Sequence, residues 1–291
     1  MIVTERNGDV VTVWATADRQ NRRHPIRFAV ETARRLVDLR NYRELIRNLV
    51  IRDLKVRYRN SIFGFAWSLL NPLFLMIVLS VVFTLVFERA TPVENFPAFL
   101  IVGLIAWNFT STSLSRAVNS VLENKQLVNK VFFPREVIPA SVVLANFVHF
   151  VLAIPVLLII LIVLGVVPNP KALLLPPLML IHLELVLGVA LLISCVNVFY
   201  RDMGVAMEVL LQAWFFATPI IYHHWILPVW LQKPAMANPL AAIITAYRDI
   251  LLLDRLPDRN FTLGALVSST LIFAIGYAVY TRYAPLFAEE V

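Results

Sequence analysis

Residues 41–60 read NYRELIRNLVIRDLKVRYRN, and after Ser61 residues 62–87 read IFGFAWSLLNPLFLMIVLSVVFTLVF. The first part has a basic face and, opposite it, a face of apolar side chains that recur at helical spacing. The apolar residues are Tyr42, Leu45, Ile46, Leu49, Val50 and Leu54. The second part has no formal charge over 26 residues, more than the ~20 apolar residues that cross a bilayer. A soluble helix followed by a core helix is the alternative, but further such runs follow. The junction therefore predicts an amphipathic interface helix leading into a membrane span.

The composition agrees with a membrane protein. Hydrophobic residues make up 59% of the chain and charged residues 15%, with a mean hydropathy of +0.74. The one cysteine, Cys195, excludes a disulfide framework. Residues 1–40 are polar and rich in arginine, without the apolar core of a signal peptide, and are expected to form a cytoplasmic extension that does not bind nucleic acid.

The chain is expected to cross the membrane six times. The apolar segments lie at about 62–87, 97–115, 137–166, 173–198, 205–222 and 263–281. If the N-terminus is cytoplasmic, the segments on the cytoplasmic side are 1–61, 116–136, 199–204 and the tail after 281. These segments hold 20 of the 26 lysines and arginines. Basic residues concentrate on the cytoplasmic side, so both termini are predicted there.

The predicted fold is an all-α membrane protein. Its parts are the extension 1–40, the interface helix 41–60, a six-helix transmembrane domain 61–282 and a cytoplasmic tail 283–291. Within the domain, residues 223–262 contain two apolar stretches that are too short to span and are interrupted by prolines. Two short re-entrant helices on the outer side are predicted there, with an ordinary outer loop carrying aromatic anchors as the alternative.

Motifs of enzymes are missing from the sequence. It contains no GxxxxGK[ST] phosphate loop, no HExxH and no paired His/Cys spacing for a metal, so we expect neither a metal site nor ATP hydrolysis by this chain. His149, His182 and Glu184 lie within predicted spans. They are candidates for a proton relay in a secondary transporter, or equally for side chains satisfied at helix interfaces.

Residues 119–136, NSVLENKQLVNKVFFPRE, form the most informative predicted cytoplasmic segment. They predict a short amphipathic helix at about 119–134, stopped by Pro134. Its apolar face suits a groove on a soluble partner, although a helix lying flat on lipid headgroups has the same pattern.

Several motifs, in order and over about residues 40–282, resemble the permease subunit of ABC-type polysaccharide exporters, the family that handles O-antigen, capsule, teichoic acid and galactan. They are NPLFLMIVLSVVFTLVF, GLIAWNFTSTSLSRA, LVNKVFFPREVIPAS, NVFYRDMGVAMEVLLQAWFFATPIIY and NPLAAIITAYRDILL. The extension of some 40 residues is longer than in compact members.

The resemblance implies a transport subunit in a bacterial inner membrane. Two copies would form a channel, and two copies of a separate ATPase, which binds ATP and Mg, would dock beneath it. Residues implied to couple to the ATPase are Glu123, Asn124, Leu127, Val128, Lys130, Val131 and Phe132. Arg135 and Glu136 would brace the base of the third span.

The implied cargo is a lipid-linked cell-surface polysaccharide that moves outward. Six cations of the interface helix would attract headgroups and substrate phosphates: Arg43, Arg47, Arg52, Lys55, Arg57 and Arg59. Aromatic candidates for lining the channel are Trp67, Trp107, Phe109, Trp214, Phe215, Phe216 and Tyr222, with a packing or lipid-facing role as the alternative for each. The alternatives are a small-lipid or drug exporter of the same class, a proton-coupled carrier, or a membrane glycosyltransferase, for which no segment is large enough.

Overall fold

The computed structural model describes residues 42–58, 66–85, 95–128, 134–167 and 169–290, without the side chains of 57–58, 68–69 and 83–85. The chain divides into two units, Met1–Glu44 and Leu45–Val291. In chain order the helices are α3 (Arg43–Tyr58), α4 (Ala66–Leu85), α5 (Phe96–Glu123), α6 (Lys125–Val128), α7 (Val137–Val163), η2 (Pro170–Leu174), α8 (Leu175–Phe199), α9 (Met203–Ala217), η3 (His224–Ile226), α10 (Val229–Ala237), α11 (Pro239–Leu251), α12 (Arg259–Tyr283), η4 (Ala284–Leu286) and α13 (Phe287–Glu290). All regular structure in these ranges is helical, as predicted.

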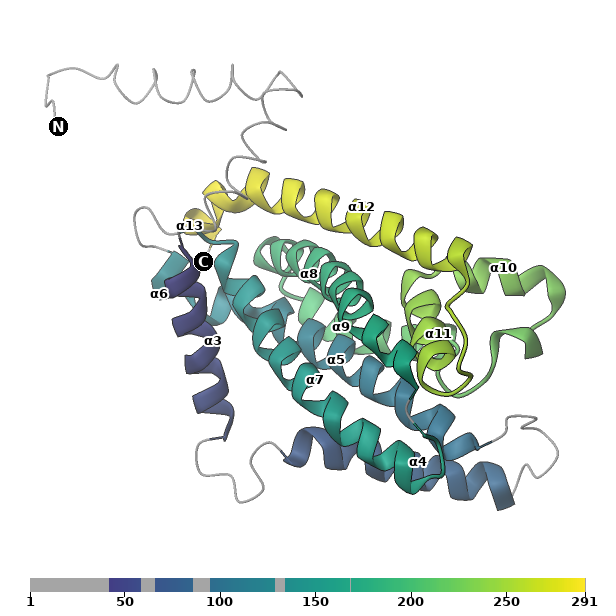
Figure 1. The fold of residues 1–291 in the computed structure, drawn as a ribbon. Helices are drawn as coiled ribbons and strands as arrows, with labels where there is room; N and C mark the ends of the chain where they lie inside the picture. Colours follow the sequence, from purple (N-terminus) through teal and green to yellow (C-terminus); the bar gives the residue numbers. More distant parts are fainter. Residues whose placement is uncertain (1–41, 59–65, 86–94, 129–133, 168, 291) are drawn as a thin grey trace, which may run out of the picture. The chain divides into compact units, whose positions relative to one another are not determined.

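Helices α5, α7, α8 and α12 form the body of the second unit (Figure 1). Together with η2 before α8 and the short helices after α12, they are the four described segments long and apolar enough to cross a membrane. Helix α4 packs on α5, and α9 packs on α5 and α8. We call the end with α6 and α13 the α6 end, and the opposite end the α11 end.

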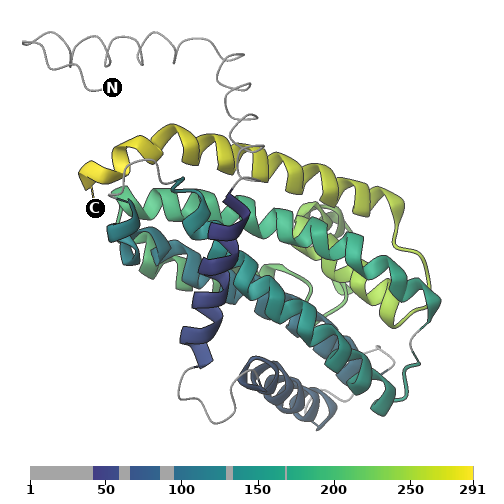
Figure 2. The same cartoon turned by 60° about the vertical axis from the view of Figure 1, so that its left-hand side comes forward.

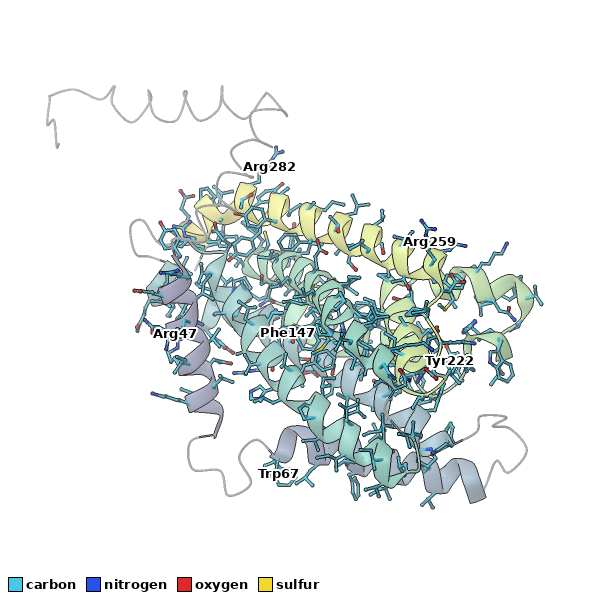
Figure 3. All side chains as sticks on the ribbon, in the orientation of Figure 1. Arg47, Trp67, Phe147, Tyr222, Arg259 and Arg282 are labelled. Atoms are coloured by element: carbon cyan, nitrogen blue, oxygen red, sulfur yellow. The ribbon has the colours of Figure 1, made fainter. Side chains whose placement is uncertain are left out.

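The centre of the bundle is a cluster of rings contributed by four helices. Phe109 of α5 stacks on Phe150 of α7, with ring centroids 5.0 Å apart, and contacts Phe147 (Figure 3). His182 of α8 packs edge-on against Phe109, and Tyr247 of α11 closes the cluster against Phe150. Such rings bury large apolar areas and fix the helices laterally.

Helices α8 and α12 cross in very close contact. A Cβ atom added at Gly188 of α8 would lie 2.6 Å from the backbone of Phe273, and one at Gly276 of α12 would collide with the Gly188 carbonyl oxygen. Small residues allow membrane helices to pack backbone against backbone, which gains dispersion contacts where lipid supplies no hydrophobic driving force.

Two predicted boundaries are wrong for identifiable reasons. Helix α5 continues to Glu123 instead of ending near residue 115, and Asn124 breaks it before α6. Residues 119–134 are therefore not one separate helix, and 129–133 lie outside the described residues. Helix α9 ends at Ala217, not at 222, because Thr218 precedes Pro219 and is extended (ψ 134°). The 15 residues of α9 are too few to cross a bilayer.

Residues 223–262, where two short re-entrant helices are predicted, contain the short helices α10 and α11, and their re-entry from the outer face stays a prediction. Asn238 begins α11 by accepting a hydrogen bond from the Leu240 amide, and Pro239 occupies the first turn. Nearly every side chain of α11 is buried. Arg248 fastens it by donating to the carbonyl oxygens of Phe99, Pro219 and Ile220, at 3.3, 2.7 and 2.6 Å.

Candidate functional site

A groove of about 490 Å³ lies between α4, α5 and α9. On α5 it is lined by Trp107, Ser111 and Ser115, which recur every four residues and so share one face. On α9 the lining side chains recur at spacings of three and four: Glu208, Leu211, Gln212, Phe215 and Phe216. Leu75 of α4 completes the wall. The groove thus combines aromatic rings with hydroxyl, amide and carboxylate groups.

Two of the aromatic rings in the groove support each other across the two helices. Trp107 and Phe215 are packed edge to face, with centroids 5.5 Å apart, and Trp107 also meets Trp214 at 6.3 Å. Phe215 contacts Phe216 at 5.2 Å. These edge contacts hold the rings in place and leave aromatic surface facing the groove.

The other proposed channel-lining aromatics lie elsewhere. Phe109 is only 3% exposed and belongs to the central ring cluster, so it is not available to line a channel. Trp214 contacts Trp107 without lining the groove and donates its Nε1–H to Asn238 Oδ1 at 3.3 Å. Tyr222 donates its hydroxyl to the Phe216 carbonyl oxygen at 2.9 Å, and Trp67 is exposed at the start of α4 (Figure 3).

The sequence interpretation missed the polar half of the groove: Ser111, Ser115, Glu208 and Gln212. Glu208 lies within the segment predicted to be the fifth span, and a charge inside a span is a functional candidate by default. The described residues include no ion-pair partner for Glu208. Its position in a predicted span was the signal that could have identified it.

A second cavity, of about 280 Å³, lies at the α6 end between α3, α5 and α7. Arg116 of α5 forms a double hydrogen bond with Asp53 of α3, both N···O distances being 2.9 Å. Arg52 of α3 donates to Asn124 Oδ1, also at 2.9 Å, and Asn124 in turn donates to the Ser120 carbonyl oxygen. Helix α3, which Figure 2 brings forward, is thereby tied to the C-terminal part of α5 and to its C-cap residue.

The proposed ATPase-coupling residues divide into three groups in the structure. Glu123 is exposed and Asn124 and Leu127 are half-buried, and all three line this cavity. Val128 is fully buried and offers no exposed surface in this structure. Lys130, Val131 and Phe132 lie outside the described residues.

The residues expected to brace the third span do form internal contacts. Arg135 donates to the carbonyl oxygens of Val128 and Ala284, and its own carbonyl accepts from the Tyr280 hydroxyl. Glu136 is buried at the start of α7. These bonds join α6, α7 and the end of α12.

The basic face of α3 is exposed where it is described. Arg43, Arg47, Arg52 and Lys55 are exposed, whereas the side chain of Arg57 and all of Arg59 lie outside the described residues. Leu49 on the opposite face is buried. This is the amphipathic pattern predicted for an interface helix.

The interior histidine of α8 is part of the packing. His182 Nε2 lies 2.8 Å from Thr110 Oγ1 and the ring is surrounded by Phe109, Phe150 and Tyr247. Among the described residues, no group of three or more His, Cys, Asp or Glu side chains is placed to hold a metal ion.

Comparison with known proteins identifies the family. Residues 44–252 match the ABC-2 type transporter family. The O-antigen export system permease protein RfbA of Myxococcus xanthus is 35% identical over 256 residues, covering 87% of this chain and 98% of that protein. An RfbA of Klebsiella pneumoniae is 32% identical (82% and 91% covered), and the polysialic acid transport protein KpsM of Escherichia coli is 24% identical (80% and 90% covered). The chain is therefore a multi-pass membrane protein that belongs to the ABC-2 type transporter family.

Proposed function

We propose that this chain is the membrane-spanning subunit of an ATP-driven exporter that moves a lipid-linked cell-surface polysaccharide outward across a bacterial inner membrane. The groove of α4, α5 and α9 carries the proposal. Sugar rings offer C–H faces that pack on Trp107, Phe215 and Phe216, and hydroxyl groups that bond to Ser111, Ser115, Gln212 and Glu208. The names of the relatives favour a glycan over a small lipid or drug.

A single chain provides only one wall of a channel. The groove is open rather than enclosed, and α4 beside it exposes large apolar side chains such as Phe74 and Ile77. A second copy facing this side would enclose the groove and cover apolar surface that otherwise meets lipid. We place the α6 end in the cytoplasm, where the exposed cations of α3 attract anionic headgroups and the phosphates of a lipid-linked substrate.

The partner ATPase is proposed to act on the α6 end. Glu123 and Leu127 present the contact surface, and the Arg116–Asp53 and Arg52–Asn124 bonds pass a displacement between α5 and α3. Nucleotide binding can shift the bundle only by favouring one of its states over the other. A long glycan does not fit a closed cavity, so extrusion proceeds in steps and translocated length scales with ATP turnover.

The test is export from proteoliposomes containing the full-length chain and the ATPase subunit that co-purifies with it. We expect ATP-dependent export that falls severalfold in Trp107→Ala and Phe215→Ala, with the complex still assembled on size exclusion. Trp230→Ala on α10, an exposed tryptophan outside the groove, is the matched control and should export normally. Export driven by a proton gradient without the ATPase, or unaltered export in both groove variants, would overturn the proposal.

A further inference from the structure

A third cavity, of about 640 Å³, lies at the α11 end and is separate from both features described above. Its walls come from the start of α5, the turn after α7, the segment around η3 and the end of α11 with the residues that follow. Small-molecule sites in proteins commonly have volumes of about 300–1,000 Å³. The space is therefore large enough for a sugar ring with a substituent.

One wall of this cavity is a continuous row of rings. The His223 ring lies 5.6 Å from Phe99, 5.0 Å from His224 and 5.2 Å from Trp225. Trp225 is about half exposed, so its indole surface is open to a ligand. His223 Nδ1 is buried and has no hydrogen-bond partner among the residues that the structure describes. The row offers an apolar platform together with an unused polar atom.

The cavity is also lined by two positively charged side chains, Arg255 and Arg248. Arg255 is held by Asp249, with Nε donating to Oδ1 at 2.8 Å, yet about half of its side chain is exposed. Arg255 Nη2 lies 2.7 Å from the same oxygen, which leaves Nη1 and the outer N–H of Nη2 to face a ligand. Arg248 is buried, and each of its three side-chain nitrogens donates to a carbonyl oxygen. It therefore contributes positive charge to the cavity without a direct hydrogen bond to a ligand. With Asp249 counted, these three side chains leave one net positive charge.

The two histidines do not add to that charge near neutral pH. Burial, followed by the charges of His224, Arg248 and Arg255, lowers the pKa of His223 to about 4. Burial also lowers the pKa of His224, although Asp249 opposes the shift. Both rings are therefore neutral at pH 7 and act as stacking and hydrogen-bonding surfaces.

A row of rings beside an immobilised guanidinium matches one ligand chemistry. A pyranose places its C–H face on aromatic rings, and a phosphate or carboxylate accepts two parallel hydrogen bonds from arginine. We propose that this cavity binds a sugar bearing a phosphate or carboxylate, with the ring against Trp225 and the anion on Arg255. The orientation proposed above puts the site on the outer face, but binding itself does not depend on export.

The test measures binding to the full-length chain in phosphatidylcholine nanodiscs at pH 7, by saturation-transfer difference NMR. The four probes are glucose 1-phosphate, glucuronate, glucose and inorganic phosphate, which separate the ring from the anion. We expect both anionic sugars to bind at least about tenfold more tightly than glucose or phosphate. Equal affinity for inorganic phosphate and glucose 1-phosphate would show a bare anion site and overturn the proposal.

Matched variants locate the binding. Arg255→Gln should weaken glucose 1-phosphate about tenfold through loss of a charged donor pair, and Trp225→Ala about threefold through loss of stacking. Arg259→Gln and Trp230→Ala remove an exposed arginine and an exposed tryptophan outside the cavity and should leave the affinity unchanged. Arg255→Gln also removes the ion-pair partner of Asp249 and could alter folding. Trp225→Ala changes an exposed side chain and is therefore the variant that disturbs folding less. Normal binding in Trp225→Ala, or equal losses in the controls, would refute this location.

Discussion

The ion pair between Arg116 and Asp53 is predicted to hold α3 on the bundle. Its two N···O distances of 2.9 Å are those of a bidentate guanidinium–carboxylate pair. The side chains are 36% and 18% exposed, so water and salt screen part of the attraction. Exposed pairs contribute ~0.2–1 kcal/mol, and this geometry with partial burial places the value at about 1–2 kcal/mol.

The perturbation is Arg116→Asp, which sets two carboxylates against each other. Loss of 1–2 kcal/mol corresponds to an increase of roughly 5- to 30-fold in the equilibrium constant for local opening of α3. Amide hydrogen exchange across residues 45–58 measures that opening directly, because each amide exchanges when its helix opens. We expect exchange there to accelerate by that factor, with little change in α8, which the pair does not touch.

The matched control is the charge-swapped double variant Asp53→Arg/Arg116→Asp, which restores opposite charges with the same summed side-chain length. It should recover most of the protection, and the Arg116→Asp effect should shrink at ~1 M salt, where the Debye length is about 3 Å. If α3 exchanges equally in wild type and Arg116→Asp, or if the swap restores nothing, the pair does not hold the helix.

Three further predictions concern stability. Gly276→Ala should destabilise the protein by about 1–3 kcal/mol in a thermal-unfolding assay in detergent, because the new methyl group meets the Gly188 backbone. The control Gly264→Ala, whose methyl group would have nothing within 4 Å, should be neutral or mildly stabilising. Equal unfolding midpoints for the two variants would contradict the close packing. Arg248→Met should lower the free energy of unfolding by about 3 kcal/mol, because it leaves the carbonyl oxygens of Pro219 and Ile220 buried without a donor. The control Arg259→Met, at an exposed position, should lower it by less than ~0.5 kcal/mol. An Arg248→Met variant as stable as wild type would refute the role of Arg248 in fastening α11. The pKa of His223 in the folded protein is about 4, below the ordinary 6.5, so the free energy of unfolding should fall as the pH drops from about 6.5 toward 4. Thermal midpoints measured at pH 7 and 4.5 should therefore differ less in His223→Gln than in wild type. The same pH response in both proteins would rule out a contribution from this histidine.

The helical class, the long apolar segments and the basic face of α3 could be predicted from the sequence, because composition and periodicity act through neighbours a few residues apart. The family motifs also follow from the sequence alone. Helix boundaries depend on local signals that can compete. At the end of α9 the apolar run continues through Tyr222, but the backbone before Pro219 is extended and the helix stops.

Which aromatic residue faces the groove was decided only by the tertiary structure. Trp107 and Phe109 are both aromatic residues in the same apolar run, two positions apart and so on opposite faces of α5. Nothing local says which face meets α9 and which meets α7 and α8. Packing against those helices buries Phe109 and leaves Trp107 at the groove.

Composition, periodicity and motifs are enough to establish a helical membrane protein of this family with a basic amphipathic helix near residues 43–58. Tertiary structure alone decided which polar residues meet. Asp53 with Arg116, and Arg248 with Phe99, are separated by 63 and 149 residues. The physical reason is that helix periodicity fixes only how side chains lie around one helix axis. Rotation and depth of each helix come from burial, close backbone contact and hydrogen bonds made with other helices.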